Sequence, residues 1–395
     1  MSATDPPLPF GLYQFEVYAK GLGDERPELA TTYDALQEQA RAALPEAAYA
    51  YVAGGAGEER TMRDNRAAFD RHRLLPRLLG EVAQRDLRTT VCDTQLSSPV
   101  ILGPVGVLSI VHPEGELAVA RAANELGVCH VLSNAASTTL EDVAEACPDA
   151  PRWFQLYPPN DPEVRRSLVR RAEAAGNEAI VVTLDTLTMP WRPRDIAQAY
   201  LPFLVGEGIA NYLADPAFRA KLERTPEEDP QGAVGMWAQT FPNPGMTWSD
   251  FAALREETSL PLIAKGVLHP DDARRAVDLG ADGVVVSNHG GRQVDGSVAS
   301  LDQLPDVVAA VPDETAVLLD SGVRTGSDVL KALALGARAV LVARPWVWGL
   351  GLRGQDGVRE VVRSLLADVD LTLAMCGASS LEDAASLLAP GHDRD

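Results

Sequence analysis

The sequence has 395 residues, of which 46% are hydrophobic and 23% are charged. This length fits two or three ordinary domains, or one barrel that carries a large insertion. The formal net charge is −21, and so acidic a body repels phosphate backbones and anionic lipids. Nucleic acids and membrane surfaces are therefore poor candidates for partners.

The cysteines and the N-terminal segment exclude several further classes of protein. The four cysteines form no C-x-x-C pair and have no histidine at metal-ligand spacing, so we expect neither a metal site nor a disulfide framework. The N-terminus lacks a basic run followed by an apolar core, and no apolar stretch approaches the roughly 18 residues of a membrane span. We expect a soluble, cytoplasmic protein.

Eight short apolar runs, bounded by glycine, proline and polar residues, are typical of parallel strands buried on both faces. They are Val100–Val105, Val128–Ser133, Arg152–Tyr157, Ala179–Leu184, Pro261–Lys265, Gly283–Ser287, Ala316–Asp320 and Ala339–Ala343. Segments with helical periodicity lie between them, at Pro113–Leu126, Leu140–Cys147, Pro162–Ala175, Pro270–Leu279 and Ser327–Leu335. Eight β-α units predict an α/β fold of the (β/α)₈ TIM-barrel type.

The remaining segments predict the domain organisation. Residues 1–95 are expected to form an N-terminal helical cap, with its clearest helix over 32–50, and residues 96–376 the barrel. A tail of 377–395 follows. The stretch 188–249, after the fourth strand, is rich in proline and aromatic residues. Because structureless loops of this length are unusual, it is interpreted as a lid or small subdomain, with an oligomer-packing insert as the alternative.

Polar residues follow the predicted strands at the end where a TIM barrel carries its active site. His289 is notable because Asn288 and two glycines flank it, and Lys265 because the chain has only four lysines. Ser321–Gly326 is typical of a phosphate-binding loop, and Arg344 follows the last strand. One motif is discounted: Gly349-Leu-Gly-Leu-Arg-Gly354 matches G-x-G-x-x-G, but it does not directly follow a strand and no strand comes after it.

Four motifs together carry a resemblance to a known family. They are Phe154-Gln-Leu-Tyr157, Thr183-Leu-Asp185, Ser287-Asn-His-Gly-Gly-Arg292 and Asp320-Ser-Gly-Val-Arg324. In order and spacing they resemble the FMN-dependent 2-hydroxy-acid oxidising family, which includes glycolate oxidase, lactate oxidase and lactate 2-monooxygenase. The likeness runs from about Tyr33 to Met375. Tyr49-Ala-Tyr-Val-Ala-Gly-Gly55, Trp191-Arg-Pro-Arg-Asp195 and the long insertion look most like the lactate 2-monooxygenase branch.

The resemblance implies FMN as the cofactor and a role for each matching residue. His289 would be the base, Asp185 its partner, and Lys265 a cation near the flavin N1–O2 edge. The substrate carboxylate and hydroxyl would be bound by Tyr51, Tyr157, Arg192 and Arg292. FMN would be bound by Pro104, Val105, Gly106, Ser133, Gln155, Thr183, Lys265, Ser287, Asp320, Ser321, Gly322, Arg324, Ala343 and Arg344. Relatives are commonly tetramers or larger, so a homo-oligomer is expected.

Three positions depart from the patterns common in the family. Ala343 and Ser321 stand where glycine is usual, although the monooxygenase branch shares the serine. Gly106 replaces the alanine common among the oxidases, and we expect it to leave more room beside the flavin N5.

The predicted reaction is oxidation of a small L-2-hydroxy acid, most simply L-lactate, with O₂. Planar arginines suit a carboxylate, and a histidine beside a carboxylate suits a base. Oxidative decarboxylation to acetate, CO₂ and water is favoured, and release of pyruvate and H₂O₂ is the alternative. Two other classes stay open on the residues alone: a Schiff-base aldolase-type lyase on Lys265, and a non-catalytic barrel that binds carboxylates.

Overall fold

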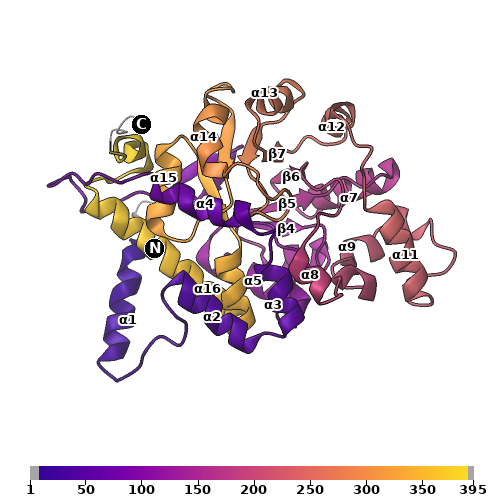
Figure 1. Ribbon diagram of the computed structural model, residues 1–395, viewed down its shortest axis with the longest axis horizontal. Coiled ribbons are helices and arrows are strands. Elements are labelled where there is room, and N and C mark those ends of the chain that lie inside the picture. The colour runs from indigo at the N-terminus through magenta and orange to yellow at the C-terminus, as the bar shows by residue number, and fades with distance from the viewer. Residues whose placement is uncertain (1–8, 390–395) are drawn as a thin grey trace.

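Eight parallel strands form a closed barrel in the computed structural model, which describes residues 9–389 (Figure 1). The strand order around the barrel is β10-β3-β4-β5-β6-β7-β8-β9. The strands are β3 (Val100–Leu102), β4 (His130–Ser133), β5 (Arg152–Leu156), β6 (Ala179–Thr183), β7 (Leu262–Val267), β8 (Gly283–Val286), β9 (Ala316–Leu319) and β10 (Ala339–Val342). The (β/α)₈ prediction is therefore confirmed.

The strands differ from the predicted runs mainly at their ends. Most of them end one or more residues earlier, so Ser287 and Asp320 lie, like His289, in the loops that follow the strands. This is where their side chains and backbone groups can bind a ligand without breaking the strand hydrogen bonds. Strand β4 ends at Ser133 as predicted, and strand β7 continues past Lys265 to Val267 through an irregularity in the pairing with β8.

A two-stranded hairpin closes the N-terminal end of the barrel. Strands β1 (Thr89–Val91) and β2 (Thr94–Leu96) pair antiparallel, and Val91 and Leu96 pack into the interior of the barrel with Trp153. The Trp153 indole N–H donates to the Thr94 hydroxyl at 3.0 Å. The interior is thus a packed core that is closed at this end, and the opposite, C-terminal end is left for ligands.

Helices surround the barrel and are positioned by clear start signals. Asp161 accepts hydrogen bonds from the backbone N–H groups of Glu163 and Val164, and Thr325 forms a capping box with Asp328. These helices are α5 (Gly115–Leu126), α6 (Leu140–Ala146), α7 (Pro162–Ala174), α12 (Trp248–Arg255), α13 (Pro270–Asp278), α14 (Ser300–Val308), α15 (Gly326–Ala334) and α16 (Arg344–Met375). Short 3₁₀ turns occur at η1 (Phe10–Leu12), η2 (Leu108–Ile110) and η4 (Leu381–Ser386).

The N-terminal segment is helical, but the single helix predicted over 32–50 is wrong. Two helices, α2 (Tyr33–Ala43) and α3 (Glu46–Ala53), are separated at Leu44–Pro45. Pro45 has no N–H to continue the helical hydrogen bonds, and it holds Leu44 in an extended conformation (φ −83°, ψ 151°). The other helices of this segment are α1 (Tyr13–Gly21) and α4 (Arg60–Asp70).

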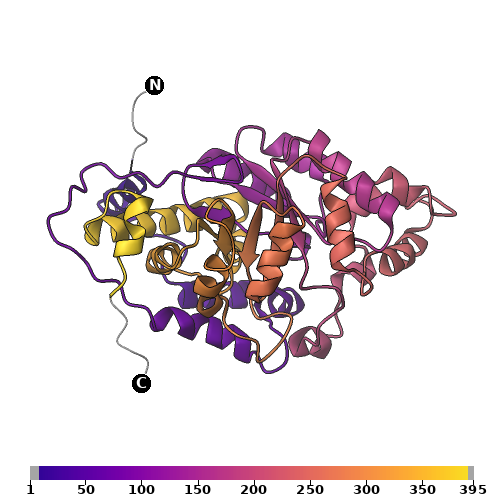
Figure 2. The same cartoon turned by 90° about the horizontal axis from the view of Figure 1, so that it is seen from above.

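The insertion after β6 is folded and has its own apolar contacts. It forms α8 (Pro193–Ala197), η3 (Pro202–Val205), α9 (Ala210–Leu213), α10 (Pro216–Arg219) and α11 (Pro230–Thr240), which extend to one side of the barrel in Figure 2. Phe203 and Trp237 stack with ring centroids 4.9 Å apart, and Phe241 joins them. This packing joins the insertion to the barrel mouth.

The last helix contains the discounted glycine pattern. Helix α16 bends where Arg353 and Gly354 leave the helical conformation. The glycines of the pattern lie within this helix and not between a strand and a helix, and no strand follows them up to residue 389. The geometry of a dinucleotide-binding turn is therefore absent there.

In residues 9–389, no helix combines the length and the apolar character that crossing a membrane requires.

Candidate active site

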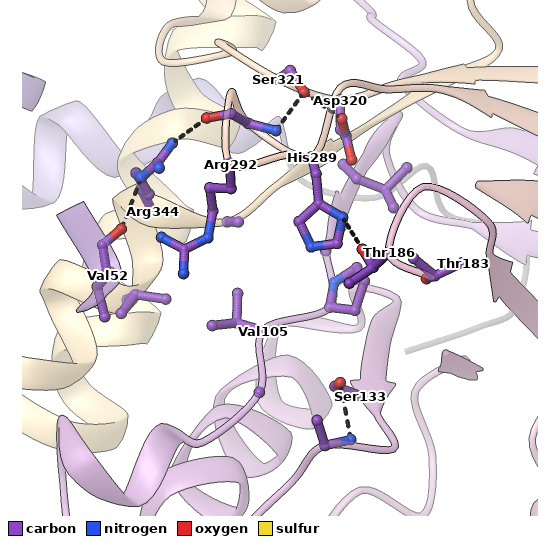
Figure 3. Close-up of a pocket in the computed structure, with 18 of the residues that line it drawn as sticks. Val52, Val105, Ser133, Thr183, Thr186, His289, Arg292, Asp320, Ser321 and Arg344 are labelled. Carbon is purple, nitrogen blue, oxygen red and sulfur yellow. Dashed lines mark hydrogen bonds between the residues drawn. The ribbon is translucent and has the colours of Figure 1, made fainter. Parts of the chain in front are cut away.

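A pocket opens at the C-terminal ends of the barrel strands and brings together most of the predicted site residues (Figure 3). Predicted residues that line it are Tyr51, Pro104, Val105, Gly106, Ser133, Tyr157, Thr183, Arg192, Lys265, His289, Arg292, Asp320, Ser321, Gly322, Arg324, Ala343 and Arg344. The three others, Gln155, Asp185 and Ser287, lie directly behind this lining and are hydrogen-bonded to it.

His289 and Asp185 form a partly buried pair at the pocket wall. The His289 Nδ1 lies 2.9 Å from Asp185 Oδ1, and because a carboxylate only accepts, Nδ1 carries the proton. His289 has a positive φ of 58°, and its backbone N–H donates to the Ser287 hydroxyl at 3.0 Å. Such a backbone conformation is uncommon outside glycine and is typical of functional sites. It turns the ring into the pocket, as Figure 3 shows.

The pKa of each member of this pair is lowered, but for a different reason. Burial lowers the pKa of His289, although the charge of Asp185 partly offsets this effect. Burial by itself raises the pKa of Asp185, but the charges of His289 and Lys265 outweigh it and lower that pKa to about 2. At neutral pH the pair is therefore a neutral imidazole beside a carboxylate, which is the state that can accept a proton at Nε2.

Tyr157 lies within hydrogen-bonding distance of that free nitrogen. Its hydroxyl lies 3.4 Å from His289 Nε2, and burial raises its pKa to about 12, so it stays protonated. Tyr157 also packs against Phe241 of the insertion at 5.3 Å between ring centroids. A ligand hydroxyl placed here can contact both a hydrogen-bond donor and a base.

Two arginines lie on another side of the pocket. Arg292 donates from one terminal nitrogen to the backbone carbonyls of Tyr51 and Gly54, each at 2.7 Å, and its guanidinium points into the pocket (Figure 3). Arg192 donates from Nε to the Arg292 carbonyl at 3.2 Å. Burial and the neighbouring Arg192 lower the pKa of Arg292 to about 9. Both groups are fixed by the backbone, as a bidentate carboxylate site requires.

A row of polar side chains crosses the mouth of the barrel from β4 to β6. Ser133 donates to Gln155 Oε1 at 2.7 Å, and Gln155 donates to the Thr183 hydroxyl at 2.9 Å. All three side chains are buried and come from the last residues of their strands or the residue before. They offer both donors and acceptors to a flat polar ring lying across the barrel mouth.

Lys265 is buried and paired with an acidic residue from a neighbouring loop. Its Nζ lies 3.3 Å from Asp320 Oδ2 and 3.2 Å from the Ser287 hydroxyl. Burial alone lowers the pKa of Lys265, but the charges of Asp320 and Asp185 more than compensate and raise it. Gly266 follows with φ +102°, and a Cβ there would lie 2.6 Å from Asp185, so a glycine is needed where β7 approaches the loop after β6.

The loops after β9 and β10 form a cationic cradle. Arg344 donates to the carbonyl oxygens of Val52, Gly290 and Gly54, and Arg324 stacks over the Tyr33 ring at 4.1 Å. The Arg324 Nε is buried and has no hydrogen-bond partner in the described structure. An unpaired buried donor beside a second arginine fits a phosphate group, which would supply the missing acceptor.

Gly106 lines the pocket, but it does not leave the open space expected from its sequence. A Cβ at this position would lie 2.7 Å from the Ala135 carbonyl oxygen, so the glycine allows two loops to pack closely. The expectation of added room next to this residue is therefore wrong.

The structure also contributes residues to the site that the sequence did not indicate, namely Thr186, Met189, Phe203, Phe241 and, behind the wall, Gln293.

The fold and the pocket together define a barrel enzyme with a site for a phosphorylated cofactor at the C-terminal ends of its strands. The model of the FMN-dependent dehydrogenase family matches residues 40–389, so the chain belongs to that family and is an FMN-dependent oxidoreductase. The donor set described above fits this cofactor: polar groups for a ring, and two arginines for a phosphate.

Similar proteins cover most of the chain. An FMN-dependent alpha-hydroxy acid dehydrogenase of Penicillium citrinum is 44% identical over 382 residues, which are 96% of this chain and 95% of that protein. The L-lactate oxidase of Lysinibacillus sphaericus is 42% identical over 339 residues, 86% of this chain and 87% of its own. A solved mandelate oxidase has a TM-score of 0.81 and 39% identity, and the match covers 92% of this chain and 99% of that one.

Proposed function

We propose that this protein oxidises small L-2-hydroxy acids, with L-lactate as the representative substrate. The observation that carries the proposal is the His289–Asp185 pair facing the same pocket as the Arg192–Arg292 pair. A 2-hydroxy acid has a carboxylate next to a carbon that bears both a hydroxyl and a hydrogen. The pocket offers a matching arginine pair, a donor and a base.

Each pocket residue has a separate role in the proposed oxidation. Arg292 and Arg192 bind the carboxylate with help from Tyr51, and Tyr157 orients the hydroxyl toward His289. His289 takes one proton at Nε2 while Asp185 holds the Nδ1–H and stabilises the positive charge that develops. FMN, when bound, takes up the two electrons that leave the substrate and passes them to O₂. The 2-hydroxy acid thereby becomes a 2-keto acid, with loss of two protons and two electrons.

The cofactor would be held by the residues already placed around the mouth. Its ring would lie against Pro104–Gly106 and bind Ser133, Gln155 and Thr183, with Lys265 supplying positive charge at one edge. The ribityl chain would bind Asp320, and Ser287 and Ser321 would orient Lys265 and Gly290 around it. The phosphate would be bound by Gly322, Arg324, Ala343 and Arg344.

The products proposed are acetate, CO₂ and water. If H₂O₂ forms while pyruvate is still bound, the two give acetate, CO₂ and H₂O, so the sum is L-lactate plus O₂ to acetate, CO₂ and water. Retention of pyruvate is supported by the insertion, because its residues Met189, Phe203 and Phe241 line the pocket. The likeness to the lactate 2-monooxygenase branch agrees with this outcome.

Release of free pyruvate and H₂O₂ is the second candidate, and the names of similar proteins favour it: L-lactate oxidase, 2-hydroxyacid oxidase and mandelate oxidase. The aldolase alternative loses support, because a Schiff base needs a neutral amine. Lys265 instead lies 3.3 Å from Asp320, and its pKa is raised.

Two measurements test the proposal. Anaerobic L-lactate should bleach the visible flavin spectrum of the purified holoenzyme; an unchanged spectrum with lactate and with other small L-2-hydroxy acids would refute the substrate class. In air, CO₂ and H₂O₂ are then measured per O₂ consumed. One CO₂ per O₂ supports coupled decarboxylation, whereas stoichiometric free peroxide without CO₂ supports the oxidase.

A further inference from the structure

One buried carboxylate near the pocket takes no part in the proposed reaction. Asp195, in the short helix α8, is 9% exposed, and within residues 9–389 neither of its carboxylate oxygens has a hydrogen-bond partner. Buried polar groups are nearly always hydrogen-bonded, so such an exception points to a specific role. Helix α8 packs against α3, the helix that carries Tyr51 (Figure 1).

The nearest cation to this carboxylate is Arg192. Asp195 Oδ2 lies 3.8 Å from Arg192 Nη1, which is too long for a hydrogen bond but close enough for a charge interaction. Burial raises the pKa of Asp195, and the charges of Arg292 and Arg192 oppose this increase. Arg192 is already fixed by its Nε bond to the Arg292 carbonyl at 3.2 Å and its Nη2 bond to Gln293 at 3.0 Å. Asp195 is therefore not required to hold Arg192 in place.

The charges around Arg292 show how the Asp195 carboxylate affects the charged form of this arginine. Arg192 from the insertion and Arg344 from α16 destabilise the charged form of Arg292, whereas Asp195 and the Tyr51 side chain favour it. Other carboxylates around the pocket are already paired, because Asp185 binds His289, Asp320 binds Lys265 and Glu59 binds Arg194. Asp195 is thus the carboxylate that remains to balance the positive charges of Arg192 and Arg292.

We propose that Asp195 is a positioning residue that sets the charge of the carboxylate-binding pair Arg192 and Arg292. It acts through these arginines without touching the substrate, since it does not line the pocket. With Asp195 ionised, two guanidiniums carry about one net positive charge, which binds a carboxylate yet lets the product anion leave. This inference rests on the proposed function, because it assumes that the arginine pair binds the substrate carboxylate.

The test measures anion binding to the FMN-loaded enzyme without turnover. Oxalate is the probe, since it has carboxylates but no C–H bond to oxidise, and its binding is followed by the change in the flavin absorbance spectrum. In Asp195→Asn, loss of the negative charge should tighten oxalate binding at pH 7 by roughly three- to thirtyfold. Asp195→Glu keeps the charge and should stay within about twofold of the wild type.

The pH dependence of oxalate binding distinguishes a charge effect from a purely structural role, because a structural role would not shift it. Burial and the charge of Arg192 lower the pKa of Arg292 to about 9, and the charge of Asp195 opposes this lowering. Removing that carboxylate should therefore shift the alkaline loss of oxalate binding to lower pH in Asp195→Asn. Glu223→Gln, which removes an exposed carboxylate from the same insertion, is the matched control and should change neither quantity.

The outcomes separate the role of Asp195 from the existence of the carboxylate site. Equal oxalate affinity and pH profile in Asp195→Asn and the wild type would overturn the role of Asp195 alone. Weaker binding at every pH would also overturn it, because Asp195 would then hold the site together. If the Asn variant does not retain FMN, Asp195→Ser makes the same charge change and is measured in its place. A wild-type enzyme that binds no oxalate would overturn the proposed carboxylate site itself.

Discussion

Replacing Asp185 by asparagine tests the electrostatic core of the proposed reaction. The pKa of Asp185 is lowered from its usual 3.8 to about 2 by His289 and Lys265, against the opposing effect of burial. At 1.36 kcal/mol for each pKa unit, this shift corresponds to about 2 kcal/mol, or one to two orders of magnitude in an equilibrium constant. The attraction itself is larger, because it also overcomes the cost of burial. We expect Asp185→Asn to slow flavin reduction by about 10²-fold or more.

The assay is anaerobic stopped-flow reduction of the bound flavin by L-lactate at saturating concentration. FMN content and oxalate affinity are measured in parallel, since an intact cofactor site and arginine pair separate a loss of basicity from a loss of structure. Thr186→Val is a useful comparison, because Thr186 donates to the same carboxylate at 3.1 Å but carries no charge. Reduction of Asp185→Asn at a rate within about threefold of the wild type would refute the argument from charge.

Three further predictions concern the base, the phosphate cradle and the barrel wall. His289→Gln should keep FMN bound and slow its reduction by about 10²- to 10⁴-fold; reduction at full speed would remove His289 from the mechanism. Arg324→Ala should weaken FMN binding by roughly 10- to 150-fold, measured from the fluorescence of released FMN, whereas the exposed Arg338→Ala should not. Burial lowers the pKa of His130 from 6.5 to about 4, so between these values the unfolded state binds more protons and stability falls as pH falls. Relative to His130→Gln, the wild type should lose about 2 kcal/mol of unfolding free energy between pH 7 and pH 5 in urea titrations, and equal losses would contradict the assignment.

The sequence predicted the barrel and the side of it that carries the site for a clear physical reason. Buried parallel strands require apolar runs, and polar residues are tolerated only where those runs stop, so His289 and Asp320 mark strand ends directly. The break at Leu44–Pro45 also has a local cause, because the proline alone is enough to end a helix. These features depend on residues that are neighbours in the chain.

Other parts of the site depend on contacts that no local pattern contains. Phe203 and Phe241 reach the pocket only because the insertion folds back and stacks around Trp237. Gln293 follows a predicted residue, yet its role comes from the distant groups that it joins, Arg192 and the Asp185 carbonyl. The close approach of Gly106 to Ala135 likewise arises from two different loops.

The distribution of charge connects the acidic composition with the proposed site. The chain as a whole carries −21, but the pocket is lined by five cations and a single carboxylate, Asp320. The cations are Arg192, Lys265, Arg292, Arg324 and Arg344. Burial and neighbouring cations lower the pKa of Arg292 to about 9 and of Arg344 to about 10, so gathering these cations at one site has an electrostatic cost. A bound phosphate and a bound carboxylate each remove part of that cost, and therefore FMN and the substrate anion should stabilise the fold as well as complete the reaction site.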